Sequence, residues 1–204
     1  VRIFGGFAGT EATLAERPAL GRTVLDGAGL PAHVVMGAGN SRLDGFTIQN
    51  GNETWNGSPA PRGGGGMKTT SATGLVVANC DFVNNQACAC GGGVRNEGGS
   101  PTFINCRFSG NLASTGAGMC NLSGATTTLE NCWFEGNKSD FRCGLSENSG
   151  SGLYNSGSSP VIRDTVFHAD LYTSMDPSGS MALAHGTEIF NSGGSPRFES
   201  VTVD

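Results

Sequence analysis

The chain has 204 residues, a formal net charge of −5 at pH 7 and only 14% charged residues. Its 34 glycines interrupt every window in which apolar residues recur at helical spacing, which excludes long amphipathic helices. The 12 Lys and Arg residues are too few for the basic stripe that binds nucleic acid. No run approaches the roughly 20 apolar residues of a membrane-spanning helix. Many short strands joined by turns are therefore expected.

The first strand-like segments lie in the N-terminal quarter of the chain. They are Val1 to Phe4, Val24 to Gly27 and Asp44 to Ile48. Residues 50–66 are rich in Gly, Pro and Asn, carry Trp55 and are predicted to be a loop. The chain closes inside another strand-like segment, Phe198 to Asp204, so we expect a single domain over residues 1–204 that is a fragment of a longer chain.

From residue 79 onward, one motif recurs every 26 residues. Each copy contains Asn, Cys, a variable residue and Phe, and the copies with their trailing Asn are Asn79 to Asn85, Asn105 to Asn111 and Asn131 to Asn137. Because side chains alternate along a strand, the Cys and Phe should point inward and the variable residue outward. The inward pairs are Cys80 and Phe82, Cys106 and Phe108, and Cys132 and Phe134; the outward residues are Asp81, Arg107 and Trp133.

A tight corner precedes each of these Cys residues. The inward residues Val77, Phe103 and Leu129 are each followed by a two-residue bend that ends in Asn79, Asn105 or Asn131. Asn tolerates a left-handed backbone, and stacked Asn amides can hydrogen-bond along the ladder. A structural role is therefore predicted for the three Asn residues.

Another strand position follows each Gly-rich stretch. Its inward residues are Met67, Val94, Met119, Leu153 and Ile189, and its outward residues are Lys68, Arg95, Cys120, Tyr154 and Phe190. Each period thus contains three short apolar segments separated by turns. This pattern predicts an all-β, right-handed parallel β-helix with three sheets and about seven to eight coils. Extra residues at 138–149 and 171–185 are predicted to be loops that gather on one edge.

These repeats resemble those of bacterial polymorphic outer-membrane proteins. The resemblance lies in Gly-Gly-Gly-Val (91–94) and in the segments Phe82 to Asn85, Phe108 to Asn111 and Phe134 to Asn137. The opening segments Phe4 to Glu11 and Leu43 to Ile48 are similar to the first coils of related β-helix surface proteins. The resemblance implies a secreted or surface-anchored bacterial protein, an adhesin or envelope component, and it brings no catalytic residues with it.

The parallel β-helix also occurs in polysaccharide lyases and hydrolases, which place carboxylates on one outer face. The outward row of the Gly-linked strands has no carboxylate before Glu188, so no catalytic residue is predicted. Lys68 and Arg95 are either surface residues with no binding role or residues that bind an acidic sugar. The candidate exposed aromatics are Tyr154, Phe190 and Trp133. These are either ordinary surface, a sugar-stacking platform or contacts to another subunit.

The Cys and His residues do not have metal-ligand spacing. Seven Cys include no CxxC pair, and His33, His168 and His185 are scattered without periodic partners, so neither a metal nor a cofactor is predicted. The three periodic Cys are expected to be buried thiols. At least one disulfide is expected among Cys88, Cys90, Cys120 and Cys143, in line with an oxidising compartment.

Together these features predict a non-enzymatic structural or adhesive β-helix segment of a secreted or cell-surface bacterial protein. Its expected partners are other subunits of a surface assembly or a glycan, with no nucleic acid and no membrane-spanning segment. The alternative is a carbohydrate-binding or carbohydrate-active β-helix. A long groove lined by Asp, Glu or Arg would favour this alternative, whereas a flat face of Ser, Thr and Asn would favour a structural role.

Overall fold

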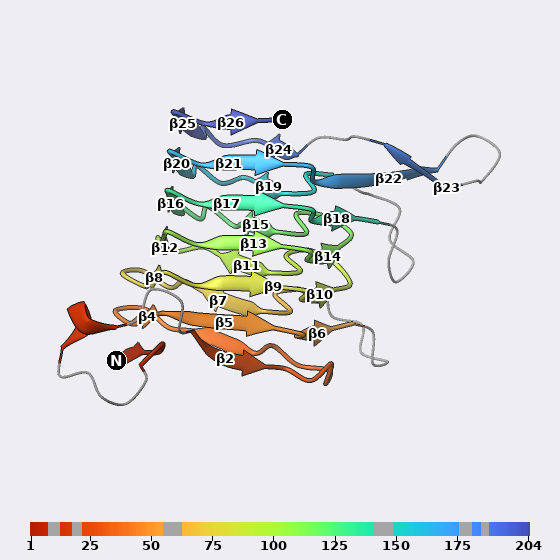
Figure 1. The fold of residues 1–204 in the computed structure, drawn as a ribbon. Coiled ribbons are helices and arrows are strands. Elements are labelled where there is room, and N and C mark those ends of the chain that lie inside the picture. Colours follow the sequence, from red (N-terminus) through yellow and green to blue (C-terminus); the bar gives the residue numbers. More distant parts are fainter. Residues whose placement is uncertain (8–12, 18–21, 55–62, 141–148, 176–180, 185–187) are drawn as a thin grey trace.

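The computed structural model describes residues 1–7, 13–17, 22–54, 63–140, 149–175, 181–184 and 188–204. In these ranges the regular structure consists of short strands and one 3-10 helix, η1 (Leu14–Glu16). The strands lie one above another in coils, and the two termini lie at opposite ends of the stack (Figure 1).

The strands belong to four sheets that run along the stack. Sheet A contains β1 (Arg2–Phe4), β4 (Arg42–Asp44), β8 (Val76–Ala78), β12 (Thr102–Ile104), β16 (Thr128–Glu130), β20 (Val161–Arg163) and β25 (Arg197–Glu199). Sheet B contains β2 (Thr23–Asp26), β5 (Phe46–Gln49), β9 (Asp81–Val83), β13 (Arg107–Ser109), β17 (Trp133–Glu135), β21 (Val166–His168) and β26 (Thr202–Val203). Sheet C contains β3 (Val35–Gly37), β7 (Met67–Thr70), β11 (Val94–Glu97), β15 (Met119–Leu122), β19 (Leu153–Ser156) and β24 (Ile189–Ser192). Sheet D contains β6 (Asn52–Glu53), β10 (Gln86–Ala87), β14 (Leu112–Ala113), β18 (Lys138–Ser139), β22 (Leu171–Met175) and β23 (Met181–Ala184).

Successive coils pair in parallel and in the register that the repeat predicts. Phe82, Phe108 and Phe134 are consecutive partners in sheet B. The predicted parallel β-helix is therefore confirmed, with seven strands in each of sheets A and B. The expected three sheets are nevertheless four. The sequence does not reveal sheet D because β10, β14 and β18 have two residues each and are too short to show alternation.

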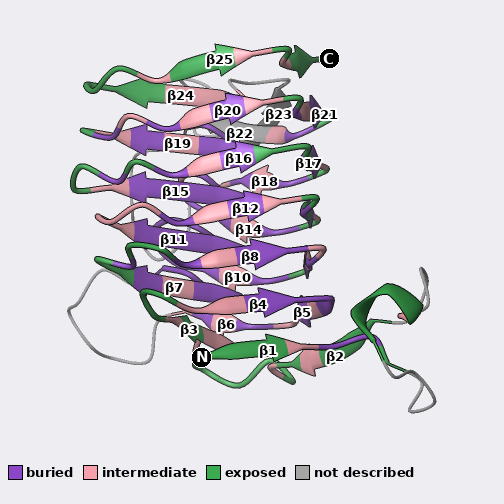
Figure 2. Cartoon of the chain, turned by 90° about the vertical axis from the view of Figure 1, so that its left-hand side faces the viewer, coloured by how far each residue is buried: buried purple, intermediate pink, exposed green. Residues whose placement is uncertain are grey.

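Aromatic rings and thiols fill the space between the sheets. The rings of Phe82, Phe108, Phe134 and Phe167 stack along the axis, with successive centroids 5.0, 4.4 and 4.6 Å apart. Cys80, Cys106 and Cys132 are buried free thiols in successive coils. Burial raises the pKa of Cys80 to about 11, so this thiol stays protonated and acts as an apolar filler. Figure 2 shows that the middle coils are largely buried, whereas the two end coils are largely exposed.

The corner between sheets A and B forms as the Asn pattern predicts. Asn79, Asn105 and Asn131 have φ angles of 51°, 52° and 51°, in the left-handed region. Asn131 Nδ2 donates to Asn105 Oδ1 at 2.8 Å, and Asn105 Nδ2 donates to Asn79 Oδ1 at 3.1 Å. The ladder ends on a carboxylate, since Asn79 Nδ2 donates to Asp44 Oδ1 at 3.0 Å.

A second Asn ladder lies inside the molecule, where sheet B turns into sheet D. Asn85, Asn111 and Asn137 are fully buried. Asn85 Nδ2 donates to Asn111 Oδ1 at 3.1 Å, and Asn111 Nδ2 donates to Asn137 Oδ1 at 2.9 Å. Each Nδ2 also donates to a backbone carbonyl of the preceding coil. These bonds compensate for the burial of the amides.

Asp170 takes the next rung of this interior ladder in place of Asn. Its Oδ1 accepts hydrogen bonds from the backbone N and the Nδ2 of Asn137, at 2.7 and 2.9 Å. Its Oδ2 has no hydrogen-bond partner among the described residues, although the side chain is 1% exposed. Burial raises the pKa of Asp170 to about 7, so this carboxyl retains a proton into the neutral range.

Three long insertions follow strands of sheet D, and a fourth, residues 5–22, runs from β1 of sheet A to β2 of sheet B and contains η1. Residues 55–62, 141–148 and 176–180 lie outside the described ranges and follow β6, β18 and β22. The prediction of a plain loop over 171–185 is wrong, because β22 and β23 pair there in antiparallel fashion. At this end of sheet D, β23 therefore pairs with β22, the strand that precedes it in the sequence.

Candidate functional site

The outer row of sheet C contains four of the five candidate binding residues. Lys68, Arg95, Cys120, Tyr154 and Phe190 are successive register partners. The structure thus brings these residues onto one face of consecutive coils, as the repeat predicts. It does not leave that face open.

Gly-rich segments fold back over this outer row. Isolated parallel bridges link Gly63, Cys90, Thr115 and Ser149 into a column beside the sheet. The fit is close, since a Cβ added at Gly63 would lie 2.8 Å from Arg95 Cδ, and one added at Gly116 would lie 2.8 Å from Tyr154 Cβ. Glycine at these two positions leaves room for the side chains beneath the covering segment.

The expectation that Arg95 lies at the surface is wrong. Its side chain is 8% exposed, and its Nη2 lies 2.7 Å from Glu97 Oε1. Lys68 Nζ lies 3.7 Å from the same Glu97 oxygen. The two cations therefore share one carboxylate, which weakens their combined attraction for an acidic sugar.

Cys120 is also buried rather than outward in solvent, because it forms a disulfide with Cys90. The two Cα atoms are 5.8 Å apart, and the bond joins the covering segment of one coil to sheet C of the next. Cys88 is disulfide-bonded as well, and Cys143 lies outside the described residues. The expected disulfide in this set of Cys residues is confirmed, and it fastens the cover to the sheet.

Tyr154 and Phe190 stack on each other at the C-terminal end of the same row. Their ring centroids are 5.4 Å apart and the interplanar angle is 4°. Both residues are half-buried, and a Cβ added at Gly150 would lie 3.1 Å from Phe190 Cβ. The pair therefore offers less aromatic surface to a ligand than two separate exposed rings would.

The outer face of sheet B is open and carries the fifth candidate, Trp133. The strands of this sheet lie at the front of Figure 1, and Trp133 is 41% exposed. Arg107 is its register partner in the preceding coil. Arg107 Nη2 lies 2.5 Å from Glu135 Oε2, and this hydrogen-bonded ion pair holds the pKa of Glu135 below its ordinary value.

His168 lies beside Trp133 and Glu135 in the following coil. It is the register partner of Glu135, and its ring centroid is 6.5 Å from that of Trp133. His168 Nδ1 lies 2.9 Å from Asp204 Oδ1, and this hydrogen bond raises the pKa of His168. At mildly acidic pH the imidazolium is therefore paired with the Asp204 carboxylate.

We define the sheet B platform as Arg107, Trp133, Glu135, His168 and Asp204. The strands place these residues on successive coils, about 4.8 Å apart. An exposed indole beside charged hydrogen-bonding groups can stack on a sugar ring and bind its hydroxyls. The platform therefore has the chemistry of a carbohydrate-binding surface.

The model of one protein family, right handed beta helix region, matches residues 17–167. The chain belongs to this right-handed beta helix family. No curated protein and no solved structure matches it. The family match agrees with the predicted hand of the coil. Both structural proteins and carbohydrate-active enzymes use this architecture, so the function of the beta helix must be argued from its surface.

The repeat pattern identifies Trp133 as a candidate but not the rest of the platform. The prediction that His168 has no periodic partner is wrong, because Glu135, His168 and Asp204 follow the inward residues of three successive sheet B strands. Insertions hide this column, since they lengthen the spacing to 33 residues and then to 36 residues. Trp55 and His185 lie outside the described residues.

In the described part of the beta helix, no group of three or more His, Cys, Asp or Glu side chains could hold a metal ion. In the same residue ranges, none of the helices has the length and apolar character that crossing a membrane requires.

Proposed function

We propose that this beta helix is a non-enzymatic, adhesive segment of a secreted or cell-surface bacterial protein, and that its sheet B platform binds a glycan. The observation that carries the proposal is the exposed Trp133 between two ion pairs, Arg107 with Glu135 and His168 with Asp204. Strands β13, β17 and β21 hold four of the five side chains, and Asp204 directly follows β26, so binding requires little ordering of the backbone.

The cysteines support a location outside the cytosol. The Cys90–Cys120 disulfide fastens a surface segment, and disulfides of this kind persist in oxidising compartments. The resemblance of the repeats to polymorphic outer-membrane proteins supports the surface of a bacterium. Neither feature depends on the platform, so location and ligand are separate parts of the proposal.

The charge state of the platform supports binding over hydrolysis. Glycoside hydrolysis uses one carboxyl group that donates a proton and a second that acts as base or nucleophile. Arg107 lowers the pKa of Glu135, which makes this group a poor proton donor at neutral pH. Asp204 is engaged with His168.

One observation favours a carbohydrate-active enzyme as the second candidate. The raised pKa of His168 gives the platform a protonated imidazole beside Glu135 in mildly acidic solution. An imidazolium in that position could donate a proton to a glycosidic oxygen. The two candidates differ in whether a bound glycan is shortened.

The test is binding of the purified chain to an immobilised panel of neutral, uronate-bearing, sialylated and sulfated glycans. Trp133→Ala and Arg107→Gln should each weaken binding of the retained glycan by roughly tenfold or more. Arg163→Gln is the matched control, because Arg163 also pairs with a glutamate of the next coil, Glu199, but lies on sheet A. This control should bind like the wild type.

Two results would contradict glycan binding at the platform: no glycan is retained, or Trp133→Ala binds as well as the wild type. New reducing ends released from a bound glycan would instead establish the enzyme. In that case His168→Asn should stop the release while the glycan still binds.

A further inference from the structure

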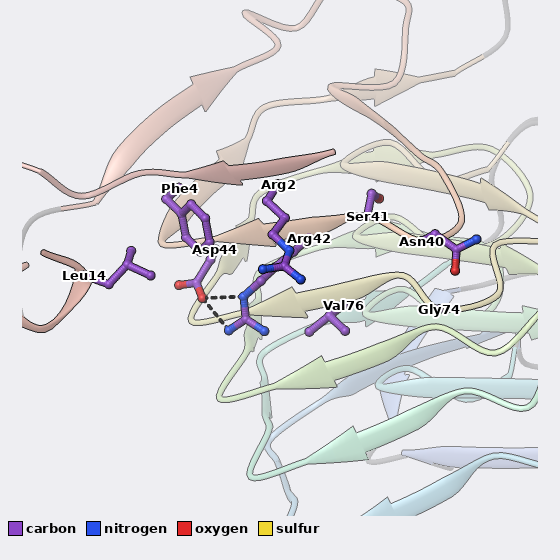
Figure 3. Close-up of a pocket in the computed structure, with 9 residues that line it drawn as sticks. All are labelled: Arg2, Phe4, Leu14, Asn40, Ser41, Arg42, Asp44, Gly74 and Val76. Atoms are coloured by element: carbon purple, nitrogen blue, oxygen red, sulfur yellow. Dashed lines mark hydrogen bonds and ion pairs between the residues drawn. The ribbon is translucent and has the colours of Figure 1, made fainter.

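A separate pocket lies on the outer face of sheet A near the N-terminal end of the stack (Figure 3). Its volume is about 580 Å³, and it is formed between η1 and strands β1, β4 and β8. Pockets of this order of size hold small organic ligands. The pocket shares no residue with the sheet B platform, so a ligand bound here is independent of the proposed function.

Two guanidinium groups line the pocket from adjacent strands. Arg2 in β1 and Arg42 in β4 are direct register partners, and both side chains appear in Figure 3. Arg42 donates from Nε and Nη2 to Asp44 Oδ2, at 3.0 and 2.6 Å. Arg17, just after η1, lies with its Nη2 2.7 Å from Asp44 Oδ1. One carboxylate thus already pairs with two arginines.

Asp44 has no capacity left for Arg2. Burial raises the pKa of Asp44, but hydrogen bonds from Asn79, Arg42 and Arg17 outweigh this effect and hold the pKa below its ordinary value. Among the described residues, Arg2 has neither an ion pair nor a hydrogen bond through its guanidinium. The described residues that line the pocket therefore carry an excess of positive charge, although the chain as a whole carries −5.

The remaining lining suits a sugar ring. Phe4 and Leu14 offer apolar surface, and Asn40 and Ser41 offer polar groups. Ser41 Oγ donates its proton to Ala38 O at 2.6 Å, so its oxygen is oriented to accept a hydrogen bond from a ligand hydroxyl. A ligand with one carboxylate, several hydroxyls and a compact ring matches this set.

We propose that this pocket binds a hexuronate, a sugar unit that carries a carboxylate. Arg2 forms the main contact, because its guanidinium can donate two parallel hydrogen bonds to the carboxylate. Arg42 contributes its charge from the adjacent strand, and the ring lies against Phe4. Binding supplies the counter-charge that Asp44 cannot give to Arg2.

The test compares two probes with the same ring: methyl glucuronoside, which has a carboxylate, and methyl glucoside, which has none. Binding to the whole chain is followed by NMR titration. The glucuronoside should bind roughly tenfold more tightly or better, and its affinity should fall as salt is added. Arg2→Gln should reduce this affinity by roughly tenfold or more.

Arg197→Gln is the matched control for Arg2→Gln. Arg197 occupies the same outward column of sheet A at the other end of the stack, and it pairs with Glu199. This control and Trp133→Ala should both bind the glucuronoside like the wild type. The proposal is overturned if Arg2→Gln binds normally, if the glucoside binds equally well, or if inorganic phosphate competes with equal affinity.

Discussion

Sheets B and C present outward residues at equivalent positions of the coil, yet only one of the two faces is open. Each carries an arginine that pairs with a glutamate. The Arg107 side chain on sheet B is 52% exposed, whereas the Arg95 side chain on sheet C is 8% exposed. The strands themselves are alike, so the difference must come from the segments between them.

The segments that enter sheet C fold back over it, whereas none of the described segments covers the platform of sheet B. The Cys90–Cys120 disulfide attaches the covering column to sheet C; the column consists of Gly63, Cys90, Thr115 and Ser149. In this beta helix, the path of the adjoining turn therefore decides whether an outward side chain reaches solvent. Strand alternation alone decides only whether the side chain points into the core.

The largest expected effect tests the cover itself. Gly116 in the covering segment and Gly136 after β17 have left-handed φ angles of 52° and 60°. A Cβ added at Gly116 would lie 2.4 Å from Met119 O, whereas no atom lies within 4 Å of one added at Gly136. Gly116→Ala should lower the free energy of unfolding by about 4 kcal/mol, and Gly136→Ala by about 1.5 kcal/mol from backbone strain alone.

Chemical denaturation of the two glycine variants measures this difference. Equal losses would mean that the covering segment does not pack closely on sheet C.

The two arginines provide the second test of the comparison. Arg95→Ala removes a buried side chain beneath Gly63 and takes from Glu97 its closer cation, so it should cost about 3 kcal/mol. Arg107→Ala removes an exposed ion pair and should cost less than about 1 kcal/mol. Thermal unfolding of both variants would show the difference, and the opposite order would contradict the burial of one face and the exposure of the other.

The smallest expected effect concerns the interior ladder behind the open face. The pKa of Asp170 is raised from 3.8 to about 7, so the folded state binds a proton that the unfolded state releases between these values. Stability from this group is therefore complete at low pH and is lost as the pH rises through about 7. The nearby Glu188 raises this pKa further, and His168 lowers it.

Asp170→Asn tests this pH dependence. An Asn at 170 is neutral at every pH, whereas the acid is neutral only while it is protonated. Relative to this variant, the wild type should lose stability on the order of 2 kcal/mol between pH 5 and pH 8, as measured by denaturant titration at several pH values. Parallel curves for the two proteins would show that Asp170 is ionised throughout.

Most of the fold could be predicted from the sequence because each coil repeats the same inward residues. Phe82, Phe108 and Phe134 recur at a spacing that permits only stacking in register. Sheet D could not be predicted, because its two-residue strands carry no periodicity. The Asn corner could be predicted because few residue types accept a left-handed backbone there.

The candidate sites were less predictable than the fold. Trp133 was identified as outward from alternation alone, whereas insertions of different length hid the column of Glu135, His168 and Asp204. The excess charge at Arg2 could not be read from the chain. It arises because Arg17 and Arg42, far apart in sequence, converge on one carboxylate.

The sequence by itself determined which residues lie above one another, because burial of a repeated apolar side chain allows only one register. The tertiary structure alone decided which outward rows remain in contact with solvent. That outcome depends on how Gly-rich turns pack across a neighbouring sheet. Glycine has no side chain whose pattern could reveal the path of such a turn.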